Sequence, residues 1–194
     1  MAGCGSGTPA AAPATTVTVT SSAPASTAPA TGSPSTPATP STGSTTTGGS
    51  APAACPTRSL SVKAGSSEGA AGSVYQVLEF SNISMQTCTL YGFPGVALAG
   101  GSPVKQIGLA AAEDHSSPRQ LVPLAPGAVA NAALRIAAAA NFPPSRCDLK
   151  NATYLQIFPP NQTTPVYLKY KAQACAKPVC ILTVSVLKPG SGGS

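Results

Sequence analysis

The chain has 194 residues, a formal net charge of +6 and charged residues at only 8% of its length. Charged residues make up about a quarter of a typical soluble domain, and such sparse charge argues against a nucleic-acid-binding protein, which needs a dense basic surface. A transmembrane helix is also not expected, because the chain has no uninterrupted apolar run of about eighteen residues.

Residues 1–4 resemble the end of a bacterial lipoprotein signal, in which an apolar residue and two small residues precede a cysteine. We therefore predict that Cys4 is lipidated in the natural protein, where two or more acyl chains would hold it firmly on a membrane. Such signals also contain a basic start and an apolar stretch of roughly 7–15 residues, and this sequence has neither. We interpret it as a mature form with an added Met or as a sequence started too late. The alternative is an incidental N-terminal cysteine.

Residues 5–54 are almost entirely Ser, Thr, Pro, Ala and Gly and carry no charge. They offer too little apolar surface to offset about 1–2 kcal/mol of backbone ordering per residue, so we predict a disordered stalk. As a coil the stalk would span about 40 Å, and fully stretched roughly 150 Å. Composition alone does not decide between a bare linker and an O-glycosylated stalk.

Residues 55–188 contain all the charged residues and are expected to form one folded domain, followed by a flexible Gly/Ser tail at 189–194. Short apolar runs separated by Gly and Pro turns predict an all-β sandwich. The predicted strands are 74–80, 87–91, 128–136, 152–158, 166–171 and 181–187.

Two of these strands show informative alternation. Residues 74–80 place Val74, Leu78 and Phe80 on one face. Residues 166–171 alternate apolar side chains with lysines, which predicts an edge strand with one face in water.

The segment 128–136 is rich in alanine, the best helix former. Apolar and polar residues nevertheless alternate along it, and Pro126-Gly127 precede it like a turn, so we predict a strand. A short helical turn can follow at 137–140.

An exported compartment permits disulfides. The spacing suggests the pairs Cys55–Cys88 and Cys147–Cys175, which leaves Cys180 as a candidate free thiol buried in the last strand. The rival is a Cys175–Cys180 bridge with Cys147 free. The six cysteines are Cys4, Cys55, Cys88, Cys147, Cys175 and Cys180.

Several motifs then stand in order along the folded segment. They are GAAGSVY (69–75), FSN (80–82), CTLYGFPGV (88–96), LAPG (124–127), LQIFPP (155–160) and LTV (182–184). Through these motifs, which span nearly all of residues 55–187, the chain resembles the domain of unknown function 4232 family of exported actinobacterial proteins, many of them lipoproteins.

The resemblance implies an all-β, immunoglobulin-like β-sandwich outside the cytoplasmic membrane, with no established activity and therefore no catalytic positions to transfer. It places the family's cysteines at Cys55, Cys88, Cys147 and Cys175, and Cys180 departs from that pattern. In such a host the stalk would carry O-linked mannose.

The segment 113–117 (EDHSS) contains the only histidine, His115, beside carboxylates and hydroxyls. Neighbouring side chains in one loop point apart, whereas nucleophilic catalysis needs Ser, His and a carboxylate to converge. We therefore interpret it as a solvated loop and assign no catalytic, cofactor or metal site. Ca²⁺ is coordinated by about six or more oxygen ligands, which this segment does not supply. A zinc site would need a second pair of ligands near Cys175 and Cys180.

Basic residues gather late in the chain, which favours anionic lipid heads, teichoic-type polymers or phosphorylated glycans; the plain alternative is a solvated face. Trp is absent, but Tyr91, Tyr154, Tyr167 and Tyr170 remain as aromatic contacts. The basic residues are Arg146, Lys150, Lys169, Lys171, Lys177 and Lys188.

Together these features predict a non-enzymatic cell-envelope lipoprotein without cofactors. It would be held by its anchor on the outer face of the cell membrane, or released, and would present a surface to an envelope protein or cell-wall polymer. The alternatives are an enzyme with an unrecognised loop-built site that uses His115 or Cys180, and a carrier of a small molecule or lipid between the sheets.

Overall fold

The computed structural model of the chain describes residues 52–192. The predicted lipidation of Cys4 and residues 5–51 of the predicted stalk lie outside the described residues. The folded part begins slightly before Cys55, because Ala54 forms a β-bridge with Thr89 and the Ala53 carbonyl accepts a hydrogen bond from the Thr89 amide.

The described residues form strands and two short 3₁₀ helices, and none of their helices is long and apolar enough to cross a bilayer. The helices are η1 (Thr57–Ser59) and η2 (Ala139–Asn141). The strands are β1 (Leu60–Ala70), β2 (Ser73–Asn82), β3 (Cys88–Tyr91), β4 (Gly95–Gly100), β5 (Lys105–Gln106), β6 (Ala112–Asp114), β7 (Leu121–Leu124), β8 (Val129–Ala137), β9 (Leu149–Phe158), β10 (Val166–Cys175), β11 (Leu182–Ser185) and β12 (Lys188–Pro189).

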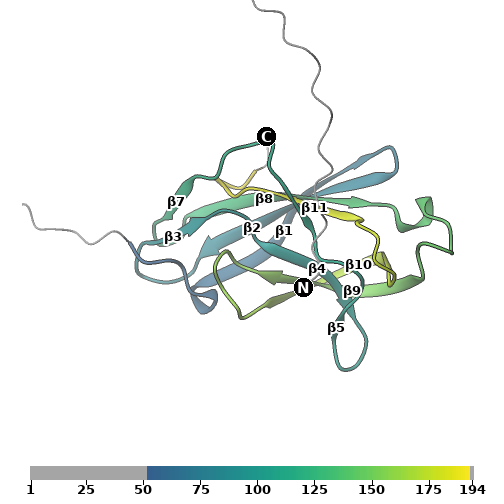
Figure 1. Cartoon of the computed structure of the whole chain (residues 1–194). Coiled ribbons are helices and arrows are strands. Elements are labelled where there is room, and N and C mark those ends of the chain that lie inside the picture. The colour runs from purple at the N-terminus through teal and green to yellow at the C-terminus, as the bar shows by residue number, and fades with distance from the viewer. Residues whose placement is uncertain (1–51, 193–194) are drawn as a thin grey trace, which may run out of the picture. The chain divides into compact units, whose positions relative to one another are not determined.

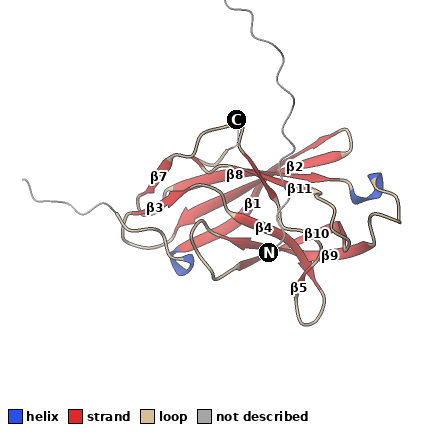
Figure 2. Ribbon diagram, viewed as in Figure 1, coloured by secondary structure: helices blue, strands red, loops and turns tan. Residues whose placement is uncertain are grey.

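Two layers of strands enclose the core (Figures 1 and 2). One sheet has the order β1-β2-β8-β11-β6, with β12 also paired to β8, and the other has the order β10-β9-β4-β5. The pair β3–β7 stands apart from both sheets. The expected all-β sandwich is thus confirmed, and β10 is an edge strand as predicted.

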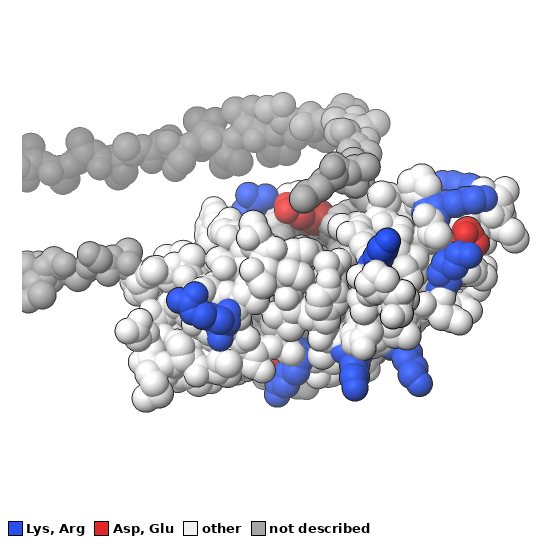
Figure 3. Space-filling model, turned by 90° about the horizontal axis from the view of Figure 1, so that it is seen from below, with Lys and Arg blue, Asp and Glu red and all other residues white. Residues whose placement is uncertain are grey.

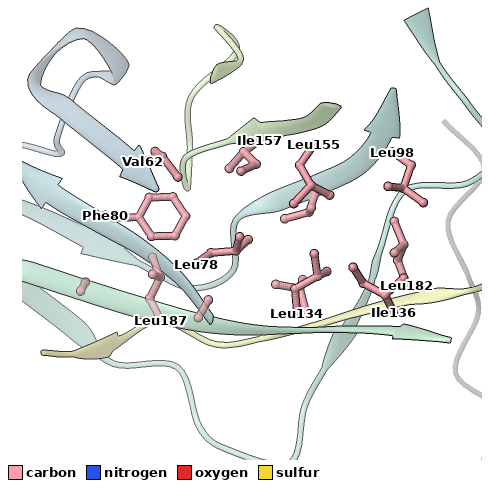
Figure 4. Close-up of a cluster of buried hydrophobic side chains, with 14 of the residues drawn as sticks. Val62, Leu78, Phe80, Leu98, Leu134, Ile136, Leu155, Ile157, Leu182 and Leu187 are labelled. Atoms are coloured by element: carbon pink, nitrogen blue, oxygen red, sulfur yellow. The ribbon is translucent and has the colours of Figure 1, made fainter. Parts of the chain in front are cut away.

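The core lies between the two sheets, and alternate side chains of β8 and of the second half of β2 contribute to it. Figure 4 shows Phe80 and Leu134 of the first sheet facing Leu155 and Ile157 of the second. The predicted strand over 128–136 is confirmed as β8. Its alanines have a packing role, because Ala130 and Ala132 pair with Phe80 and Leu78 and leave room for these larger side chains.

The other predicted strands are confirmed as β2, β3, β9 and β10, with ends shifted by a few residues. The last predicted strand is shorter, since β11 covers only Leu182–Ser185, and the expected helical turn is η2. Six strands were not predicted, namely β1, β4, β5, β6, β7 and β12. The sequence of β1 is rich in Ser and Gly and becomes a strand only through its pairing with β2.

Disulfides pair Cys55 with Cys88 and Cys147 with Cys175. The pairing suggested by the spacing is confirmed, and the rival Cys175–Cys180 bridge is wrong. Among the described residues no cysteine is free, so the expected free thiol at Cys180 is also wrong. Cys180 lies exposed before β11 and is not buried within it, because the strand begins only at Leu182.

Candidate functional site

The loop that contains the only histidine is held against the turn between β3 and β4. The Glu113 carboxylate lies 3.0 Å from Nη2 of Arg119 and 3.5 Å from Nε2 of His115. The Phe93 ring meets the His115 ring edge-on at 5.1 Å, and the Arg119 guanidinium lies 5.2 Å from the Phe93 centroid. These four residues form the His115 cluster. Its loop is exposed, but it is packed and not simply solvated.

The His115 cluster lacks the geometry of a catalytic site. Asp114 accepts a hydrogen bond from the Ser116 backbone amide, and within residues 52–192 no hydrogen bond joins His115 to a serine hydroxyl. Nor do the described residues contain a group of three or more His, Cys, Asp or Glu side chains arranged to hold a metal ion. Exposed ion pairs of this kind contribute about 0–1 kcal/mol, so these contacts hold the loop only weakly.

A second candidate is a β-bulge in the edge strand β10. Lys169 pairs with Tyr154, and the next paired residue, Ala172, lies opposite Ala152. Two residues of β10, Tyr170 and Lys171, therefore face one residue of β9, which is the arrangement of a β-bulge. Bulges bend a strand and redirect its side chains, so this edge does not continue as a flat ladder.

The bulge forms one wall of a surface hollow of about 340 Å³, which we call the outer hollow. Beside it, the exposed Tyr167 meets Tyr154 edge-on at 6.3 Å and accepts a hydrogen bond from Gln156 Nε2 at 3.1 Å. The outer hollow is lined by Thr153, Tyr154, Lys169, Tyr170 and Lys171.

The same bulge borders a groove of about 390 Å³, which we call the inner groove, where β2 begins and β8 ends. Its lining comes from both sheets, namely from residues 72–74 and 136–139 on one side and 170–173 on the other. Val74 pairs with the buried Ile136 and shares its face of the sheet, yet 38% of Val74 is exposed. The inner groove is thus a stretch of the core face that is open to solvent.

Tyr170 takes part in both hollows and is half-buried. Burial raises the pKa of the Tyr170 hydroxyl, because desolvation disfavours the phenolate. The hydroxyl therefore stays neutral across the physiological range and can donate a hydrogen bond at the boundary between the two hollows.

Of the late basic residues that the sequence singled out, the structure brings only Lys169 and Lys171 to this site. Lys150 pairs with Asp148 at 3.2 Å, and Lys177 donates hydrogen bonds to backbone carbonyls of the loop before β9. The Lys and Arg side chains on the face shown in Figure 3 are scattered and form no continuous patch. Tyr91 also lies elsewhere, on β3.

The sequence did not predict the apolar half of this site. Val74 and Ile136 stand in the alternating pattern that is typical of core positions. The apolar and basic residues of β10 also alternate as they would in a regular strand without a bulge. The only sequence signals near this site were the Gly-containing turn that precedes β2 and the helical turn that follows β8. Here the Gly72 carbonyl accepts hydrogen bonds from the Ala138 amide and Asn141 Nδ2, which fixes the rim of the inner groove.

Comparison with known proteins gives one match. The family model described as Domain of unknown function (DUF4232) matches residues 55–188, which is the span of the described sandwich. No curated protein and no solved structure matches the chain.

Proposed function

The chain belongs to the DUF4232 family, and from the surface of its sandwich we propose that it is a non-enzymatic binding protein of the cell envelope. On this proposal a lipid anchor at Cys4 and the stalk hold the sandwich at a distance from the membrane. The sandwich then presents β10 and the neighbouring face of β9 to an envelope protein or a cell-wall polymer. A nucleic-acid partner is not proposed.

The extracytoplasmic location has direct structural support. Two disulfides staple the sandwich, and such bonds persist in oxidising compartments outside the cytoplasm. One of them, Cys147–Cys175, ties the loop before β9 to the last residue of β10. The strand that carries the proposed surface is therefore fixed at its end, which lowers the entropy lost when a partner binds.

The observation that carries the proposal is the exposed mixture of aromatic and cationic groups at the bulge. Tyr167 is 46% exposed beside Tyr154, and Lys169 and Lys171 form no ion pair with any residue in 52–192. Tyrosines contribute large contact area with a polar tip, and uncompensated lysines attract anionic groups. Tyrosine is also among the residues that are enriched where proteins bind partners.

Site-specific photo-crosslinking in cells tests this surface. A photo-reactive phenylalanine analogue is placed at Tyr167 of the exported full-length protein, with Tyr75 as the matched control, since Tyr75 is 42% exposed on β2 of the other sheet. We expect an envelope protein or wall polymer to be captured from position 167 and not from position 75. Equal capture from both positions, or capture from neither, would contradict the proposal.

The anchor is tested separately. If Cys4 carries acyl chains, Cys4→Ser should move the exported protein from the membrane fraction to the medium while the sandwich stays folded. Membrane association that survives this substitution would show that Cys4 is not the anchor.

The carrier alternative has one observation in its favour, which is the inner groove. Ligand sites in proteins typically have volumes of about 300–1,000 Å³, and the inner groove, at about 390 Å³, falls in that range. The enzyme alternative gains no comparable support from the His115 cluster.

A further inference from the structure

The two hollows beside β10 are adjacent and differ in chemistry. The outer hollow carries two lysines and a threonine, whereas the inner groove has a floor of aliphatic side chains from Val74, Ile136 and Ala139. Tyr170 and Lys171 line both of them. A ligand that spans the bulge would therefore meet a cationic region and an apolar region within a few residues of each other.

The apolar half is uncovered core. Val74 and Ile136 pair directly and share one face of the sheet, but Ile136 is 6% exposed and Val74 is 38% exposed. An aliphatic chain laid along this groove would remove apolar surface from water on both sheets, which is favourable in proportion to the area buried. Tyr170 and Ala172 would cover it from the side of β10.

The polar half favours an anion. Three of the five acidic residues, Glu79, Glu113 and Asp148, already form ion pairs with basic partners away from the bulge. Lys169 and Lys171 remain without an acidic partner among the described residues. A phosphate or carboxylate would complement them, with the Thr153 and Tyr170 hydroxyls available as further hydrogen-bond donors.

We propose that the β10 bulge binds a single-chain anionic amphiphile, with its head group on Lys169 and Lys171 and its chain in the inner groove. This inference goes beyond the proposed function, because it assigns to the same edge strand a ligand that is neither an envelope protein nor a wall polymer. A flat protein partner would use the exposed lysines and tyrosines but would not reach the aliphatic floor.

The test uses the full-length chain with its disulfides formed and lysophosphatidylglycerol as the probe, kept below the concentration at which it forms micelles. Binding is followed by NMR of the methyl groups, so that the site is identified together with the affinity. Lysophosphatidylcholine with the same acyl chain tests the need for net negative charge, and glycerol phosphate tests the need for the chain. We expect lysophosphatidylglycerol to bind roughly tenfold or more tightly than either of these and to shift the methyl signals of Val74, Ile136 and Ala172.

Two variants and their matched controls test the assignment. The double variant K169Q/K171Q should weaken binding of lysophosphatidylglycerol by roughly tenfold. The control K105Q/K188Q removes the same charge from exposed lysines on β5 and β12 and should leave binding unchanged. Val74→Phe should fill the inner groove and abolish the chain-dependent part of the affinity, whereas Leu121→Phe, at an exposed position on β7, should not.

The amphiphile proposal is overturned if lysophosphatidylglycerol does not bind as a monomer, if lysophosphatidylcholine binds equally well, or if both lysine pairs have the same effect. Crosslinking from position 167 then decides the broader question. A captured envelope protein or wall polymer without amphiphile binding would leave the proposed function standing and remove only this inference. If neither a captured partner nor amphiphile binding is observed, the proposed function and this inference are both wrong.

Discussion

The inward face of β2 is closed at one end of the sandwich and open at the other. Phe80 is 0% exposed and lies among Val62, Leu78 and Ile157 in Figure 4. Val74, on the same face of the same strand, is 38% exposed. The closed end maximises burial, whereas the open end leaves apolar surface available for contact, at a cost in stability that the rest of the core must offset.

The closed end is also held by a buried polar residue. Asn82 is 1% exposed, and its Nδ2 donates to the carbonyls of Gln86 and Leu124 at 2.8 and 2.9 Å. Its Oδ1 accepts hydrogen bonds from the Ser84 amide and hydroxyl at 2.9 and 2.7 Å. A single side chain therefore fixes the loop after β2 and joins it to β7. At the open end, the buried polar residue that lines the inner groove is Ser73, whose side chain forms no hydrogen bond of this kind with the described residues.

The largest expected difference between the two ends comes from truncating the same face of β2 at each end. Phe80→Ala should lower the free energy of unfolding by about 4 kcal/mol, because it removes a fully buried ring and leaves a cavity. Val74→Ala should cost less than about 1 kcal/mol, because much of the valine is already in water. Urea unfolding of the two variants measures both values. If both variants lost a similar free energy of unfolding, Val74 would be covered in solution, and the interpretation of the inner groove as open would be wrong.

The two disulfides allow a second comparison of the ends. Cys55–Cys88 lies near the closed end, at the start of β3, and Cys147–Cys175 lies near the open end, at the last residue of β10. In the chain-entropy model, loops of 33 and 28 residues each correspond to about 3.5 kcal/mol. We expect the double variants C55S/C88S and C147S/C175S to lose similar stability in chemical unfolding.

Their local effects should differ. Amide hydrogen exchange in the folded state should speed up along β10 only in C147S/C175S, because Cys175 is the last residue of that strand. Equal acceleration of β10 in both variants would indicate that the disulfide does not fix the edge strand separately from the rest of the sandwich.

The buried amide at the closed end should be the next largest contribution. Asn82→Ala removes a buried hydrogen bond to the Leu124 carbonyl and a part-buried one to the Gln86 carbonyl, and it should cost about 2–3 kcal/mol. Asn131 is the matched control, since its Nδ2 also donates to backbone carbonyls but at an exposed site, and Asn131→Ala should cost less than about 1 kcal/mol. Thermal and urea unfolding of both variants would test this. A loss at Asn131 as large as that at Asn82 would contradict the importance of burial.

Much of the closed end could be predicted from the sequence. The alternation of Leu78 and Phe80, and of Leu134 and Ile136, identified two central strands, because residues that face a continuous core repeat with period two. The turn residues located the ends of several strands, and the cysteine spacing suggested the two disulfides. The role of Asn82 was not predicted, although it lies in the FSN motif, because its buried partner, Leu124, is on β7 and 42 residues away in the chain.

The open end was predicted only in part. Lys169 and Lys171 were recognised as a basic edge, but Val74 and Ile136 have the same pattern as fully buried positions. Whether an inward position is covered depends on how the opposite sheet ends. The bulge at Tyr170 and Lys171, which sets that ending, arises from the register between β9 and β10. Register is a property of the pair of strands, so it cannot be predicted from the sequence of β9 or β10 alone.

The smallest expected effect belongs to Tyr170 at the open end. Burial raises the pKa of its hydroxyl in the folded state, so the folded protein keeps this proton at a pH where the unfolded chain releases it. The resulting stabilisation is complete below the ordinary tyrosine pKa of about 10 and is lost as the pH rises through the folded-state pKa. Tyr170 should therefore ionise late in a phenolate absorbance titration.

Tyr170→Phe should remove this late titration and make the free energy of unfolding fall less steeply above pH about 10. Tyr75→Phe, at an exposed tyrosine on β2, is the control for the loss of one phenol and should leave the late titration of Tyr170 in place. Binding of an aliphatic chain in the inner groove should bury Tyr170 further and delay its ionisation. A titration of Tyr170 that is ordinary in the free protein, and unchanged when lysophosphatidylglycerol is bound, would place its hydroxyl in open water and remove it from the boundary of the groove.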